Sequence, residues 1–301
     1  MEARYLVSVI IATYRRDSEL KRALESLISQ TYQQIEVIVV DDNANDEWNS
    51  KVAAIIKTLK EKANFPIVHI INSTNLGSAR TRNKGIENSN GDYITFLDDD
   101  DCYLENKIEA QLKDMIENNA DYGITDLFLY NSNDKLIDKR VRSYIKDYSM
   151  QSLLKYHMME HMTGTDTLMF KKEFLDKING FDEIEIDIGD EYYLMEKAIL
   201  SGGKLKYSPH CYVKAYVHQG DESGLSSGIG KVNGENRLFE EKRKYFYLLN
   251  KKEKRQIKMR HYAVIAFAKY RMRKYVSFVV SAMISFLIDP FALLNMLLKH
   301  K

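Results

Sequence analysis

The stretch Gly91-Asp-Tyr-Ile-Thr-Phe-Leu-Asp98-Asp-Asp-Asp101 joins an apolar segment directly to four aspartates. The apolar residues 93–97 predict a short buried strand. Four consecutive carboxylates repel one another unless a positive charge lies between them, and Mg²⁺ and Mn²⁺ prefer oxygen ligands of this kind. The stretch therefore indicates a divalent-cation site. A solvated acidic loop, or N-cap residues for a helix over 105–115, are the alternatives.

The chain before these aspartates repeats a strand followed by a helix. The apolar and β-branched runs predict strands at 7–12, 35–40 and 67–71, and the periodic segments predict helices at 17–30, 48–63 and 78–87. This alternation predicts an α/β fold with a Rossmann-like, doubly wound, mostly parallel sheet. Ligands of such sheets bind beyond the carboxyl ends of the strands, so Asp41 and Asp42 are expected near Asp98.

The second half of the chain has a mixed pattern. Short strands are expected around 123–130 and 167–170 and a helix around 191–201, which would complete the sheet and cover the crevice. The segment 220–234 contains five glycines and reads as a mobile loop. Basic helices are expected at 237–247 and 260–274.

Composition excludes several classes of protein. The 44 Lys and Arg balance 43 Asp and Glu, so no global positive field indicates a nucleic-acid partner. Cys102 and Cys211 form no CxxC pair, which fits a reducing cytoplasm without a disulfide framework. The apolar run 6–12 is too short for a signal peptide. The first strand is followed by 12–16 rather than by a GxGxxG turn, which argues against a nucleotide-binding oxidoreductase.

The order of these motifs resembles family 2 glycosyltransferases of the GT-A fold. The segments that carry the resemblance are Val7-Ser-Val-Ile-Ile-Ala-Thr-Tyr14, Val39-Val-Asp-Asp42, Asn75-Leu-Gly77, Arg82-Asn-Lys-Gly85, the aspartate stretch, Asn179-Gly-Phe-Asp-Glu183 and Gly189-Asp-Glu191. They span roughly residues 5–230. Their ordered combination is far more specific than any single motif.

The resemblance implies a non-processive enzyme of the bacterial surface-polysaccharide type. It implies inverting, metal-dependent transfer of one sugar, a hexose or N-acetylhexosamine, from a nucleotide sugar, with UDP expected, to a hydroxyl of a glycan or lipid-linked glycan. The Gln-x-x-Arg-Trp segment of processive synthases is missing, because Trp48 is the only tryptophan. A non-catalytic carbohydrate- or nucleotide-binding protein of the same fold is the alternative.

The resemblance also assigns domains and residues. Residues 1–235 would form the catalytic domain, with a donor half over about 1–122 and an acceptor half over about 123–235, and 236–301 would form a helical extension. Mn²⁺ or Mg²⁺ would bind Asp100 and His218. Asp190 is the first choice for the catalytic base and Glu191 the second, the alternative being a helix cap. The donor would contact Thr13, Tyr14, Arg16, Asp42, Asn75, Gly77, Arg82, Asp98 and Asp99.

The segment His157-Met-Met-Glu-His161 has the HxxEH spacing of a metalloprotease motif but lacks an evident third ligand. Because the family resemblance runs through it, we expect it to contribute to the acceptor side instead.

The C-terminal segment is basic over 242–274 and apolar over 275–298, with an interruption at Asp289-Pro290. Neither apolar piece reaches the roughly 20 residues of a spanning helix. One interpretation is a helical appendage that packs on the catalytic domain or on a second copy. The other is a monotopic anchor at the inner face of the cell membrane, which would suit a lipid-linked acceptor.

Overall fold

The computed structural model describes residues 5–183, 189–217 and 228–299. The chain separates into two compact units, which we describe one at a time. The first contains residues up to Met150, Met162–Glu183 and the segment that begins at Asp190. The second contains Gln151–His161 and the C-terminal helices. The expected domain boundary at 235 lies inside helix α8, Gly228–Lys244.

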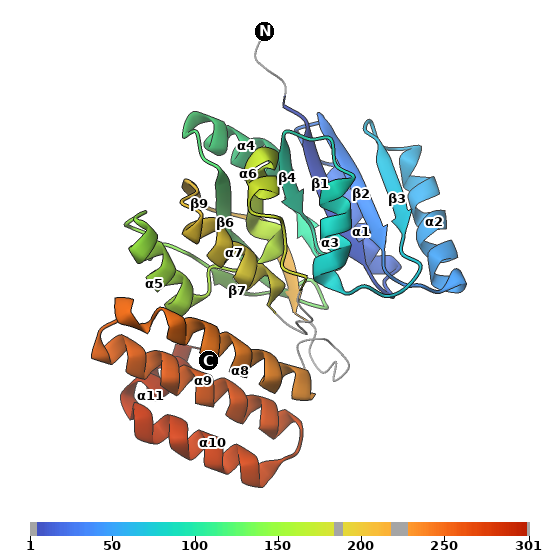
Figure 1. The fold of residues 1–301 in the computed structure, drawn as a ribbon. Coiled ribbons are helices and arrows are strands. Elements are labelled where there is room, and N and C mark those ends of the chain that lie inside the picture. The colour runs from blue at the N-terminus through green and yellow to red at the C-terminus, as the bar shows by residue number, and fades with distance from the viewer. Residues whose placement is uncertain (1–4, 184–188, 218–227, 300–301) are drawn as a thin grey trace. The chain divides into compact units, whose positions relative to one another are not determined.

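The first unit is built on a nine-stranded sheet (Figure 1). Four parallel strands form its first half in the order β3-β2-β1-β4. They are β1, Val7–Thr13; β2, Ile35–Asp41; β3, Ile67–Ile71; and β4, Tyr93–Phe96. Their register sets Thr13 opposite Asp41, so the carboxyl ends of β1 and β2 lie side by side.

The second half of the sheet is mixed. Strand β8, Leu168–Lys171, runs antiparallel between β4 and β6, Tyr122–Asn131. Strand β9, Leu205–Val217, is parallel to β6. The short strands β5, Cys102–Tyr103, and β7, Leu136–Arg140, pair antiparallel with β9 and β6. Since β6 and β9 keep the direction of the first four strands, the expected mostly parallel sheet is confirmed.

Helices cover both faces of the parallel half, as the doubly wound prediction requires. They are α1, Ser18–Ile28; α2, Asp46–Lys60; and α3, Ser78–Glu87. Val9 and Ile11 belong to one core cluster with Leu24 and Val52 of the first two helices. The next side chain along β1, Ile10, points to the other face, because residues of a strand alternate between faces.

Residues at the helix ends explain where the chain changes direction. The Asn45 side chain accepts a hydrogen bond from the Trp48 amide and caps α2, which begins with two acidic residues, Asp46 and Glu47. The first unit also contains α4, Lys107–Glu117; the 3-10 turn η1, Thr165–Thr167; α6, Lys172–Lys177; and α7, Asp190–Leu200.

The second unit is helical. It contains α5, Met150–Glu160; α8; the 3-10 turn η2, Phe246–Leu248; α9, Lys251–Arg271; α10, Tyr275–Ile288; and α11, Pro290–Lys299. Asn250 and Glu253 form a capping box that begins α9. The expected loop over 220–234 is wrong for residues 228–234, which form the first turns of α8. Helix packing overrides the low helix propensity of glycine there.

Within the described residues, no single helix is both long and apolar enough to cross a bilayer. Helices α10 and α11 meet that test only as a pair, which is bent by 112°.

Candidate active site

The candidate site lies in the first unit, beyond the carboxyl ends of β1, β2 and β4. The residues after β4, Asp98–Asp101, turn away from the sheet before β5 begins. Thr13 ends β1, and Asp42 follows β2. The fold therefore brings together carboxylates that the chain separates by more than fifty residues, as the sequence predicted.

Three carboxylates form an acidic cluster, which comprises Asp98, Asp101 and Asp166. One oxygen of each lies within 4.8 Å of the others. The amide of Asp98 donates to Asp166 Oδ1 at 2.6 Å, and the Tyr216 amide donates to Asp101 Oδ1 at 2.8 Å. These backbone donors hold two of the carboxylates in place, and the Asp101 and Asp166 carboxyl groups also share a hydrogen bond.

Burial and mutual repulsion make the acidic cluster hard to ionise fully. Burial and the neighbouring Asp166 raise the pKa of Asp101 well above its usual range. Burial and the charge of Asp98 raise the pKa of Asp166 in the same way. Because opposite charge nearby would favour the ionised forms, the donor set fits a hard divalent cation.

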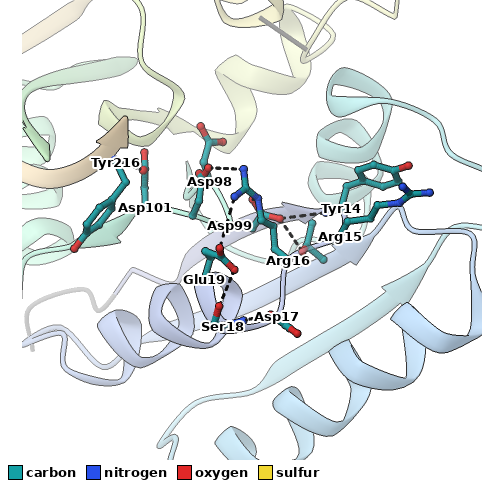
Figure 2. A network of polar contacts seen from close by, with 12 residues as sticks. Tyr14, Arg15, Arg16, Asp17, Ser18, Glu19, Asp98, Asp99, Asp101 and Tyr216 are labelled. Carbon is teal, nitrogen blue, oxygen red and sulfur yellow. Dashed lines mark hydrogen bonds and ion pairs between the residues drawn. The ribbon is translucent and has the colours of Figure 1, made fainter. Parts of the chain in front are cut away.

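The two aspartates between these ligands face the segment that joins β1 to α1. Asp99 accepts from Thr13 Oγ1 at 2.8 Å and from the Tyr14 amide at 3.1 Å. Figure 2 shows Arg16 beside Asp99, whereas the Tyr14 ring points away from this carboxylate. Arg16 lies 2.9 Å from a carboxylate oxygen of Asp100. The sequence predicted Asp100 as a metal ligand; here its carboxylate lies against Arg16, and it is not part of the acidic cluster.

Asp42 is almost fully buried, and its carboxylate organises the loop before α3. It accepts hydrogen bonds from the amides of Leu76 and Gly77, at 2.8 and 2.9 Å. Asn75 donates back to the Asp42 carbonyl at 3.0 Å. Gly77 has φ of +80°, which glycine adopts without strain. Three of the residues expected to bind the donor, Asp42, Asn75 and Gly77, are thus joined in one turn.

Arg82 of α3 connects the acidic cluster to the start of α7. Its guanidinium lies 2.6 Å from Asp98 Oδ1 and 2.6 Å from Asp190 Oδ2. Its side chain is only 11% exposed, so water screens these ion pairs weakly. Ser78 also donates to Asp190, at 2.9 Å.

The two acidic residues at the start of α7 have opposite properties. Burial opposes ionisation of Asp190, but Arg82 and its hydrogen-bond donors outweigh burial and lower its pKa. Burial and the adjacent Asp190 carboxylate raise the pKa of Glu191. Of the two carboxyl groups, Glu191 therefore has the pKa that suits uptake of a proton near neutral pH.

Sequence reasoning missed Asp166 and did not name Asp101 among the individual metal ligands. No spacing relates Asp166 to the aspartate stretch, because it enters the site from η1, before the antiparallel strand β8. Among the described residues, His157 and His161 belong to no group whose ligand atoms converge, so the HxxEH spacing forms no metal site there. His218, the second expected metal ligand, lies outside the described residues.

The chain is similar in sequence to known proteins. The family model described as Glycosyl transferase family 2 matches residues 8–178. The uncharacterized glycosyltransferase MJ1057 of Methanocaldococcus jannaschii is 35% identical over 181 residues, which are 59% of each chain. The UDP-Glc:alpha-D-GlcNAc-diphosphoundecaprenol beta-1,3-glucosyltransferase WfgD of Escherichia coli is 31% identical over 129 residues, 43% of this chain. The matches cover 59% and 48% of these two relatives' own length.

Solved structures share the fold at low sequence identity. S. aureus TarS 1-349 in complex with UDP-GlcNAc is 17% identical with a TM-score of 0.62, over 91% of this chain and 79% of the TarS 1-349 chain. The mannosyltransferase PcManGT from Pyrobaculum calidifontis, in complex with GDP-Man and Mn²⁺, is 15% identical with a TM-score of 0.65. That likeness covers 99% of this chain and 85% of PcManGT. The expected GT-A fold is confirmed.

Proposed function

Because the chain belongs to glycosyl transferase family 2, we propose that it moves a single sugar from a UDP-sugar to a hydroxyl of a glycan or lipid-linked glycan. The proposed reaction inverts the anomeric carbon and depends on a divalent cation. The observation that carries it is the acidic cluster at the carboxyl end of β4, beside the turn that Asp42 organises.

Asp98, Asp101 and Asp166 would hold the cation. A bound Mn²⁺ or Mg²⁺ would neutralise charge on the departing nucleoside diphosphate. Arg16 neutralises Asp100 at 2.9 Å, and an arginine is also a strong ligand for a diphosphate. We infer that Arg16 turns to the diphosphate when the donor binds, which releases Asp100 toward the cation. In this way the residue predicted from the sequence would join the acidic cluster only in the donor complex.

Glu191 would be the catalytic base. It would take the proton from the acceptor hydroxyl while that oxygen forms the new bond to the anomeric carbon and the bond to the diphosphate breaks. Asp190, the first choice from the sequence, accepts from both Arg82 and Ser78. Its lowered pKa makes it a weak base, so we assign it the positioning of Arg82 instead.

The finer parts of the proposal have support from similar proteins. TarS was solved with UDP-GlcNAc, which supports a UDP-sugar donor. PcManGT was solved with Mn²⁺, which supports a divalent cation. The name of WfgD describes an acceptor linked to diphosphoundecaprenol, which supports a lipid-linked acceptor and a site of action at the inner face of the cell membrane.

Calorimetry with UDP tests the proposal directly. We expect UDP to bind the full chain with Mn²⁺ present and to bind at least about tenfold more weakly with EDTA, because carboxylates without a cation repel a diphosphate. GDP serves as the comparison nucleotide. Equal UDP affinity with and without Mn²⁺ would contradict the metal-dependent mechanism. Binding of UDP without turnover of any UDP-sugar would favour the non-catalytic alternative.

A further inference from the structure

Helix α10 has its polar side chains turned toward the protein and its apolar side chains turned outward. Ser281 and Ser285 are 3% and 1% exposed. Ser285 Oγ donates to the Met259 carbonyl of α9 at 2.9 Å, and Lys269 of α9 donates to Ser281 at 3.0 Å. A surface helix of a water-soluble protein buries its apolar side instead. Figure 1 shows α10 running beside α9 in the second unit.

The outward side of α10 is continuously apolar. Val276, Met283 and Leu287 are 82%, 58% and 76% exposed. With Val280, their spacing of four, three and four residues puts them on one side of the helix. On α11, Phe291 is also 79% exposed. We call the four exposed residues of α10, Val276, Val280, Met283 and Leu287, the outer apolar face. Exposed apolar surface of this extent marks an interaction site.

Positive charge borders the outer apolar face. The exposed residues Arg271, Arg273 and Lys274, which we call the basic turn, come directly before α10. Residues 251–301 contain twelve Lys and Arg but only two acidic residues. Both acidic residues are engaged within the second unit. Glu253 pairs with Lys155 at 2.5 Å, and Asp289 pairs with Arg255 at 2.9 Å.

We propose that the outer apolar face inserts into the head-group region of an anionic lipid bilayer, with the basic turn on lipid phosphates. The 112° bend makes α10 and α11 a two-helix wedge rather than one rod. A second copy fits the same surface less well, because an isologous contact would bring two positively charged borders together without a counter-charge. The inference deepens the proposed function, since it names the surface on which a lipid-linked acceptor would be met.

Vesicle flotation of the full chain tests this inference. The vesicles are phosphatidylcholine alone or an equal mixture of phosphatidylcholine and phosphatidylglycerol. Val276→Glu with Leu287→Glu changes the outer apolar face, and Arg273→Glu with Lys274→Glu changes the basic turn. Tyr247→Glu is the matched apolar control, because Tyr247 is 75% exposed in the same unit but lies outside α10 and α11. The double variant Lys57→Glu with Lys60→Glu on α2 is the control for the basic-turn variant, because it makes the same change of charge away from α10.

The wild-type chain and both controls are expected to float with the anionic vesicles only. The outer-face variant should stay at the bottom of the gradient. The basic-turn variant should lose at least about thirtyfold in partitioning at low salt, because each basic residue near an anionic surface contributes about a fivefold factor. Circular dichroism checks that each variant is folded.

Two outcomes would overturn the inference. One is a wild-type chain that does not float with anionic vesicles. The other is a lipid-free dimer that the outer-face variant converts to a monomer, since the surface would then join two copies. UDP binding with Mn²⁺ is measured on the same preparations. Flotation lost with UDP binding intact bears on the membrane inference alone, and UDP binding lost with flotation intact bears on the proposed function alone.

Discussion

At the scale of single residues, Arg82 holds one member of the acidic pair at the start of α7. It lies between Asp98 and Asp190 at 2.6 Å from each, in a position that water reaches poorly. An arginine held by two carboxylates is rigid, because its planar donors match carboxylate oxygens. Asp190 is therefore held by Arg82, and in the proposed function Glu191 is the residue that takes up the proton.

Replacement of Glu191 separates binding from transfer. We expect Glu191→Gln to lower the transfer rate at least about a hundredfold, because general base catalysis contributes that much. Affinity for UDP with Mn²⁺ should stay unchanged, which calorimetry measures. Asp190→Asn should instead weaken UDP binding, since Arg82 loses a charged partner. If Asp190→Asn kept binding and lost transfer while Glu191→Gln stayed active, Asp190 would be the base.

Variants of Asp166 and Asp100 distinguish the resident metal site from the donor-dependent one. Asp166→Asn should weaken Mn²⁺ binding without nucleotide by about tenfold or more, because it removes one charged ligand from the acidic cluster. Asp100→Ala should leave that affinity unchanged and weaken only the binding of UDP with Mn²⁺. Electron paramagnetic resonance of free Mn²⁺ measures the first quantity. Asp138→Asn, on exposed strand β7, is the control. If Asp166→Asn and Asp100→Ala weakened Mn²⁺ binding without nucleotide to the same extent, the proposed turn of Arg16 from Asp100 to the diphosphate would be ruled out.

At the scale of elements, helix α3 depends on a close contact with the sheet. Gly85 approaches β1 so closely that an added Cβ atom would lie 2.4 Å from Ile10 Cγ2. Because Ile10 is 1% exposed and surrounded by core, it has little room to move. The same helix carries Arg82, so this contact fixes the height of Arg82 above the sheet.

A methyl group at this contact should therefore affect both stability and the site. We expect Gly85→Ala to lower the free energy of unfolding by about 1–3 kcal/mol, the usual cost of overpacking a core. Urea denaturation measures the loss. Glu87→Ala, an exposed change in the same helix, is expected to stay within about 0.5 kcal/mol of wild type. A Gly85→Ala chain as stable as wild type would show that α3 can move away from β1.

At the scale of the whole molecule, the raised pKa values in and beside the acidic cluster predict a lower stability of the metal-free chain at neutral pH. Burial and the neighbouring Asp100 raise the pKa of Asp99 to about 7. Its ordinary value is about 4, so between pH 4 and 7 the folded chain binds more protons than the unfolded chain. The contribution of Asp99 to stability therefore falls as pH rises through this range. Asp190, whose pKa is lowered, makes a contribution to stability that rises with pH, but this rise is confined to the acid range.

The resulting prediction concerns thermal unfolding at different pH values. In EDTA, the midpoint temperature should fall between pH 5 and pH 8, because burial and the charges of neighbouring carboxylates oppose the ionisation of Asp99, Asp101 and Glu191. Mn²⁺ with UDP should raise the midpoint more at pH 8 than at pH 5, since a cation binds the ionised forms. Differential scanning fluorimetry measures both series. A midpoint that rises with pH in EDTA would contradict the shifted pKa values.

The sequence by itself determined the features that depend on neighbouring residues. The strands at 7–12, 35–40, 67–71 and 93–97 and the helices between them match the structure within a few residues, because hydrophobic period and caps are local. The positions of Asp42 and Asp98 at strand ends followed from the same patterns. Their placement at one edge of the sheet followed from the rule that parallel strands share a carboxyl edge.

Only the tertiary structure decided which carboxylates meet. Asp166 joins Asp98 and Asp101 because β8 lies antiparallel beside β4, and no local pattern records which strand becomes a neighbour. The ion pair of Arg16 with Asp100 and the buried serines of α10 also depend on tertiary packing. Each depends on contacts between residues far apart in the chain. Hydrophobic periodicity predicts that a helix or strand forms, but packing decides which side chains face one another.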